Sequence, residues 1–169
     1  SFAEIATITD RPTIFKDADI IVTVNPLPDA ELSAIKKGTL LISMFAPYAD
    51  ETVVGKLKEH GLQAVSMDMI PRSSLAQAMD ILSSMAAVAG YKAVLMAASH
   101  LPRYFPMMIT AAGSIRPAKV LILGAGVAGL QAIATARRLG AIVEAFDVRS
   151  AVKEEVASLG AKFIEVEGA

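Results

Sequence analysis

Short apolar runs alternate with amphipathic helical patterns along most of this chain. The apolar runs predict strands near residues 20–24, 40–44, 62–67, 120–123, 142–146 and 163–166. Helical spacing between them predicts helices that begin at capping residues Asp29 and Asp50, and others at residues 127–139 and 151–159. Strands that alternate with helices in this way are typical of parallel sheets joined by crossover helices.

One apolar segment is too long to be a strand in this alternation of strands and helices. It predicts a long helix from Leu75 onward, although Arg72, Gln77 and Asp80 make its beginning polar. Helical spacing puts Gln77 and Asp80 on one face, and Ser83 follows Asp80 by about one turn. Gln77 completes an S-x-x-Q capping box, and a carboxylate early in a helix suits the helix dipole. Spacing therefore gives these residues a structural explanation and leaves a functional one open.

The order of the predicted elements divides the chain into three segments. Residues 1–71 predict a partial α/β domain, residues 72–115 a polar loop, a long linking helix and an irregular connector, and residues 116–169 the first half of a dinucleotide-binding domain. Both sheets look incomplete, because residues 1–8 supply at most one strand and the second sheet stops at its third. The expected fold class is α/β, with Rossmann-like parallel sheets in two domains joined by a long helix.

Composition narrows the possible functions. The chain has 54% hydrophobic residues, 20% charged residues and a formal net charge of -1, which offers no electrostatic basis for binding nucleic acid. The absence of cysteine excludes a disulfide scaffold, thiol catalysis and cysteine-ligated metals. A membrane-spanning helix needs about 20 apolar residues, whereas the charge-free part of the long helix covers residues 81–91. We therefore expect a soluble chain without a metal site.

A glycine-rich motif lies between a predicted strand and a predicted helix. Gly124, Gly126 and Gly129 form G-x-G-x-x-G, in which the first glycine permits a tight turn. The second glycine lets the backbone approach a pyrophosphate, and the third lets the helix pack against the strand. The helix N-terminus then offers N–H groups and a partial positive charge to phosphates. This context favours a dinucleotide site.

An acidic residue lies where such a site needs one. Asp147 ends the next predicted strand, 18 residues after Gly129, where a carboxylate can accept hydrogen bonds from a ribose diol. Its charge would repel a 2′-phosphate, which favours NAD(H) over NADP(H). Two alternatives stay open: Arg149 could accept a 2′-phosphate, or the turn could be without a ligand and Asp147 could cap the next helix.

Three segments carry a resemblance to a known family: IPRSSLAQAMDILSSMAAVAGYKAV, PMMITAAGSIRPAKVLILGAGVAGLQAIATARRLGA and DVRSAVKEEVASLGAKF. They resemble the soluble NAD(H)-binding domain I in the alpha subunit of proton-translocating NAD(P) transhydrogenase, which is related to alanine dehydrogenase. The resemblance implies that Arg72, Gln77 and Asp80 line the nicotinamide site, with Ser83 close to the same ring. The resemblance also implies which residues contact the rest of the dinucleotide. Those at the pyrophosphate are Gly124, Ala125, Gly126, Val127 and Gly129. Those on the adenosine side are Asp147, Val148 and Arg149.

The same resemblance implies an activity and partners. The activity is direct hydride transfer from NADH to NADP⁺ on a separate domain, of the Si-specific/Re-specific type, coupled to proton translocation. Two nicotinamides exchange a hydride without a proton donor, so positioning does the catalysis. The implied partners are an NADP(H)-binding domain, a membrane domain and a second copy of the chain. The implied location is the cytoplasmic face of the bacterial inner membrane or the matrix side in mitochondria, and the isolated chain would be inactive.

Two other functions remain in view. Alanine dehydrogenase has the same two-domain plan, but its chemistry also moves protons and therefore needs a histidine and a lysine. In that family these residues lie in, or just after, strands that match residues 20–25 and 40–44, and here neither is present. The chain's histidines, His60 and His100, lie in a helix end and the connector. The incomplete sheets also leave room for a non-catalytic NAD-binding or dimer-forming module.

Overall fold

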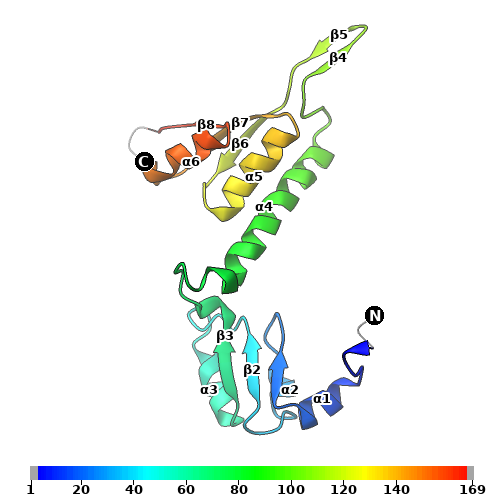
Figure 1. Cartoon of the computed structure of the whole chain (residues 1–169), viewed down its shortest axis with the longest axis vertical. Coiled ribbons are helices and arrows are strands. Elements are labelled where there is room, and N and C mark those ends of the chain that lie inside the picture. Colours follow the sequence, from blue (N-terminus) through cyan, green and yellow to red (C-terminus); the bar gives the residue numbers. More distant parts are fainter. Residues whose placement is uncertain (1–3, 167–169) are drawn as a thin grey trace. The chain divides into compact units, whose positions relative to one another are not determined.

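The computed structural model describes residues 4–166, which divide into two compact units between Ile81 and Leu82 (Figure 1). Each unit contains a three-stranded parallel sheet with helices between successive strands. The expected fold class, α/β with parallel Rossmann-like sheets, is therefore confirmed. Because each unit has its own hydrophobic core, the two are described in turn.

The sheet of the first unit has the strand order β1-β2-β3. These strands are Ile20–Val22, Leu40–Ser43 and Gln63–Ser66, and the register pairs Ile21 with Leu41 and Leu41 with Ala64. Helices α2 and α3, Asp29–Leu32 and Thr52–Glu59, connect them. The apolar side chains that fill the core of this unit are Phe15, Ile21, Leu32, Ile35, Leu41, Phe45, Leu57 and Leu62.

In the described part of the chain, a helix that the sequence pattern did not predict precedes β1. Residues 4–8 contain no strand, and helix α1, Arg11–Asp17, follows them. Its N-cap is Asp10, whose carboxylate accepts a hydrogen bond from the Thr13 N–H at 2.9 Å, and a proline occupies its first turn. Phe15 then buries the apolar side of this helix in the core. The sequence signals of this helix are an aspartate at the N-cap and a proline in the first turn.

The two acidic residues expected to cap helices behave differently. Asp50 accepts hydrogen bonds from the backbone and hydroxyl of Thr52, at 3.0 and 2.6 Å, and so supports the start of α3. The prediction for Asp29 is wrong, because it is the first residue of α2 and the cap position is a proline without a side-chain bond. Its carboxylate instead pairs with Lys56 at 2.7 Å.

The long helix begins later than the sequence indicates. Helix α4 is Ile81–His100, and a separate 3₁₀ turn, Gln77–Met79, precedes it. Asp80 lies between them with φ -76° and ψ 85°, which is not helical, so the helix cannot continue through it. The expected helical face shared by Gln77 and Asp80 is therefore wrong. The N-cap of the 3₁₀ turn is Ala76, which makes no side-chain capping bond.

The second unit contains a parallel sheet of order β6-β7-β8. Its strands are Lys119–Leu123, Ile142–Phe146 and Lys162–Phe163, the last shorter than expected. Helices α5, Val127–Arg138, and α6, Lys153–Ser158, connect them, with a 3₁₀ turn, Ser150–Val152, before α6. This is the strand–helix alternation of half a dinucleotide-binding fold.

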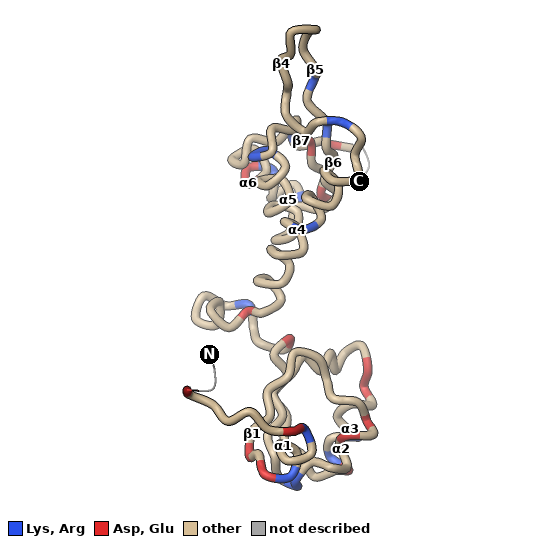
Figure 2. Tube along the Cα trace, turned by 90° about the vertical axis from the view of Figure 1, so that its right-hand side faces the viewer, with Lys and Arg blue, Asp and Glu red and all other residues tan. Residues whose placement is uncertain are grey.

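The connector after α4 is not irregular throughout. It forms an antiparallel hairpin of β4, Met108–Thr110, and β5, Gly113–Ile115, which projects from the second unit (Figure 1). Gly113 has φ +129°, a conformation that a side chain would strain, and the Thr110 hydroxyl donates to its carbonyl at 3.0 Å. The two strands contain no charged residue, and Figure 2 shows basic residues only where the chain leaves β5.

Within the second unit, the backbone of helix α4 lies in direct contact with the backbone of α5. A Cβ atom at Gly90 would lie 2.1 Å from the carbonyl oxygen of Ala128, so only glycine fits this position. One turn further, Val94 is buried in the core of the unit. By length and composition α4 could also cross a membrane, which corrects the expectation that no segment is long enough. Core helices of globular proteins meet the same criteria but are mostly buried, whereas only 11% of the apolar window of α4 is buried, with Gly90 and Val94 as its buried residues.

Candidate dinucleotide-binding site

The glycine-rich turn connects β6 to α5, and each of its glycines has a distinct environment. Gly124 has φ +93°, the left-handed region that favours glycine, and its N–H donates to the Phe146 carbonyl of β7 at 2.8 Å. A Cβ atom at Gly129 would lie 1.8 Å from the carbonyl oxygen of Gly124. Backbone therefore contacts backbone inside the turn, and α5 begins close to the end of β6.

Gly126 differs from the other two because neither its backbone angles nor its neighbours among the described residues require a glycine. Its φ of -80° and ψ of -168° are extended angles that any residue adopts. A Cβ atom there would meet no atom within 4 Å. The space beside this backbone is therefore open to a ligand, which is the role that the motif gives its second glycine.

The N-terminus of α5 also fits a phosphate. Gly126 is its N-cap and supplies no side-chain acceptor, and no acidic residue lies in its first turn. The first N–H groups of a helix lack intrahelical partners and carry a partial positive charge. Open space at the second glycine and an uncapped helix start are together the features that a pyrophosphate needs.

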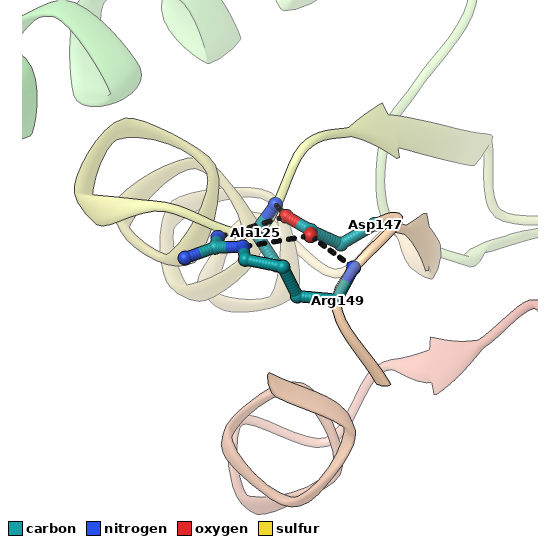
Figure 3. Close-up of polar contacts among 3 residues, drawn as sticks. All are labelled: Ala125, Asp147 and Arg149. Carbon is teal, nitrogen blue, oxygen red and sulfur yellow. Dashed lines mark hydrogen bonds and ion pairs between the residues drawn. The ribbon is translucent and has the colours of Figure 1, made fainter. Parts of the chain in front are cut away.

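Asp147 follows β7 and lies against this turn (Figure 3). Its Oδ2 accepts a hydrogen bond from the Ala125 N–H at 2.7 Å, although the two residues are 22 positions apart. Its Oδ1 accepts from the Arg149 backbone N–H at 2.8 Å. The Arg149 guanidinium adds one bond to each oxygen, both at 3.0 Å. The structure thus brings together four of the predicted site residues: Gly124, Ala125, Asp147 and Arg149.

The charge of Asp147 is strongly stabilised. The Arg149 guanidinium is the main cause that holds the pKa of this carboxyl well below its ordinary value, and the N–H groups of Arg149 and Ala125 lower the pKa further. The Asp147 side chain is only 6% exposed, so the charge needs these partners. Asp147 does not cap the following helix, because the 3₁₀ turn after it has Arg149 at its cap position and no side-chain bond there.

This ion pair predicts a pH-dependent difference in stability between the unchanged chain and a variant that lacks the guanidinium. A carboxyl with a lowered folded pKa stabilises the fold above its ordinary pKa, and that contribution is lost as the pH falls through the lowered value. Arg149→Ala removes the guanidinium, which is the main cause of the lowered pKa of Asp147. We expect this variant to unfold at lower urea concentration than the unchanged chain at pH 7, with a difference that shrinks below about pH 4. Urea titrations followed by circular dichroism measure it, and a difference independent of pH would contradict it.

The other predicted residues around the turn are apolar. Ala125 is buried, whereas Val127 begins α5 with its side chain exposed and Val148 is 75% exposed. Exposed apolar side chains beside a polar turn suit contact with the flat face of a base. Neither side chain contributes to the core of the unit. Their assignment to the pyrophosphate and the adenosine side stays a prediction.

The residues predicted for the nicotinamide belong to both units. Arg72 and Gln77 are exposed and Asp80 is partly buried in the loop that ends the first unit. Ser83 is partly buried in the first turn of α4, in the second unit. Asp80 and Ser83 both have polar interactions within the chain. Across residues 4–166, His, Asp and Glu side chains do not gather into a group of three that could hold a metal ion.

The parallel half-sheet, the open glycine turn and the acidic residue at the next strand end define a dinucleotide-binding protein of the Rossmann type. The family model for the N-terminal domain of alanine dehydrogenase/PNT matches residues 3–89, and that for the C-terminal domain matches residues 93–169. The chain therefore belongs to the alanine dehydrogenase/PNT family. This family membership implies binding of a nicotinamide dinucleotide.

Individual relatives agree with the family. The chain is 47% identical over 165 residues to NAD(P) transhydrogenase subunit alpha of Cereibacter sphaeroides, covering 98% of this chain and 32% of that protein. The crystal structure of transhydrogenase from Sinorhizobium meliloti superposes with a TM-score of 0.87 at 50% identity, over 91% of this chain and 46% of that one. An L-alanine dehydrogenase superposes with a TM-score of 0.72 at 25% identity, over 92% and 44%. The chain thus spans less than half the length of each.

Proposed function

We propose that this chain is the NAD(H)-binding part of a proton-translocating transhydrogenase. The observation that carries the proposal is the Asp147 carboxylate, fixed by backbone N–H groups against a glycine turn with open space at Gly126. The similarity to transhydrogenase alpha subunits supports the reaction class. Bound NADH would supply a hydride to NADP⁺ on another domain.

In this proposal the protein binds and orients, and it moves no proton at the reacting atoms. The N–H groups at the start of α5 would hold the pyrophosphate, and Asp147 would accept from the hydroxyls of the adenosine ribose. Arg72, Gln77 and Asp80, with Ser83, would orient the nicotinamide. A hydride that passes between two nicotinamides needs no general acid or base, so alignment supplies the rate acceleration.

The same proposal includes the surroundings of the chain. The partners would be an NADP(H)-binding domain, a membrane domain that couples the reaction to proton movement, and a second copy of the chain. The chain would then face the bacterial cytoplasm or the mitochondrial matrix. The relatives named as subunits of transhydrogenase support the existence of partner subunits.

Nucleotide selectivity tests the proposal directly. We expect the complete polypeptide to bind NADH with micromolar affinity and NADPH more weakly, because the Asp147 carboxylate would face the 2′-phosphate of NADPH. Isothermal titration calorimetry with both nucleotides measures the ratio. Equal or tighter NADPH binding would remove the assignment of Asp147 as the ribose acceptor.

The role of the polar loop is tested by Gln77→Asn. Shortening this side chain by one methylene should slow hydride transfer by about 10-fold or more, because the loss of orientation acts on the transition state. NADH affinity should change much less. Stopped-flow transfer rates and calorimetry separate the two, and Gln63→Asn on β3 is the matched control within the first unit. A proportional loss of rate and affinity would mean that Gln77 contributes uniform binding.

Alanine dehydrogenase activity is the second candidate, supported by the structural likeness to L-alanine dehydrogenase. That reaction requires groups that transfer protons near the reacting carbon. Of the two histidines, His60 follows the end of α3 and His100 is the exposed last residue of α4. Reduction of NAD⁺ by L-alanine, assayed beside transhydrogenation, distinguishes the two activities.

A further inference from the structure

The hydrogen bonds on Asp147 fall into two kinds. A carboxylate has about four acceptor positions, two on each oxygen. Here all four are filled: each oxygen accepts one bond from a backbone N–H and one from the Arg149 guanidinium. A ribose diol could not bond to this carboxylate unless a present donor leaves it. The backbone donors, Ala125 and Arg149 N–H, are fixed by the fold.

The guanidinium donors are the replaceable pair. Nε donates to Oδ1 and Nη2 to Oδ2, so the two side-chain donors are arranged one to each oxygen, as the fork of an arginine allows. A vicinal diol also presents two donors to one carboxylate. The Arg149 side chain is 59% exposed and sits on a flexible stem, so it can leave into solvent while the backbone bonds keep Asp147 in place.

We propose that the Arg149 guanidinium is an internal substitute for the adenosine ribose diol, which occupies Asp147 and competes with the nucleotide for it. This inference rests on the proposed function, because it takes Asp147 as the ribose acceptor. Arg149 keeps the buried carboxylate paired before the nucleotide binds and lowers the apparent affinity by the cost of its own displacement. An arginine beside an anionic ligand would ordinarily strengthen binding, so the sign of its effect separates the two roles.

Calorimetry of the complete polypeptide shows whether Arg149 raises or lowers nucleotide affinity. The ligand is ADP-ribose, which carries the adenosine ribose without the nicotinamide. We expect Arg149→Ala to bind ADP-ribose and NADH about 2- to 10-fold more tightly, because this variant has no Arg149–Asp147 ion pair to break when the ribose binds. Arg149→Lys, which cannot form the two-pronged contact, should show a smaller gain. Arg138→Ala removes the same charge from the far end of α5 and should show none.

A double-mutant cycle gives the second readout. In an Asp147→Asn background the substitution Arg149→Ala should no longer tighten binding, because there is no carboxylate to compete for. Reduced nicotinamide mononucleotide, which lacks the adenosine ribose, should bind equally to the unchanged chain and to Arg149→Ala. Unchanged or weaker ADP-ribose binding by Arg149→Ala would overturn the inference. A failure of the unchanged polypeptide to bind NADH would instead overturn the proposed function.

Discussion

Gly129→Ala is expected to destabilise the second unit by about 3 kcal/mol or more, and NADH binding should be lost with the fold. The added Cβ would lie 1.8 Å from the carbonyl oxygen of Gly124, and backbone cannot rotate away as a flexible side chain could. Either α5 must move from β6 or the turn must open, and both disrupt the core that Ile133 and Ala136 form under α5. Thermal unfolding by circular dichroism measures the loss.

Gly126→Ala is the matched control in the same turn. Its Cβ would meet nothing within 4 Å and its backbone angles suit alanine, so we expect a change in stability below about 1 kcal/mol. NADH affinity should nevertheless fall about 10-fold or more, because the methyl group enters the space assigned to the pyrophosphate. Equal stability of both variants would contradict the packing argument, and unchanged NADH affinity of Gly126→Ala would contradict the phosphate site.

Asp147→Asn is expected to lower NADH affinity on the order of 10- to 100-fold, the second large effect. An amide keeps one acceptor oxygen and replaces the other with a donor, which would then face the N–H of Ala125 or the guanidinium of Arg149. The ribose would also lose a charged acceptor. Calorimetry with NADH measures the change, and discrimination against NADPH should decrease in the same variant.

Glu144→Gln provides the control for the loss of one negative charge from β7. This residue lies three positions earlier on the strand and outside the turn, so its NADH affinity should stay close to that of the unchanged chain. Asp147→Asn with undiminished NADH affinity would show that the carboxylate orders the turn without contacting the nucleotide.

Local pattern predicted most of the strands and helices, and it failed where one residue interrupts an otherwise regular run. The apolar spacing predicts that the long helix begins at Leu75. The extended ψ of Asp80 ends that pattern and leaves Gln77 in a 3₁₀ turn. The β4–β5 hairpin differs from its local pattern for the opposite reason, since nearby prolines indicate an irregular segment while Gly113 permits the tight reversal.

The candidate site also has features that the sequence predicts and features that only the structure shows. The sequence by itself determined the glycine turn, its place between strand and helix, and the acid at the next strand end, because these depend on backbone preferences and on spacing along one strand–helix–strand unit. Only the tertiary structure decided that Asp147 bonds to Ala125 and that Arg149 folds back over it. The parallel register of β6 and β7 brings these residues together across 22 positions, and no local pattern encodes that register.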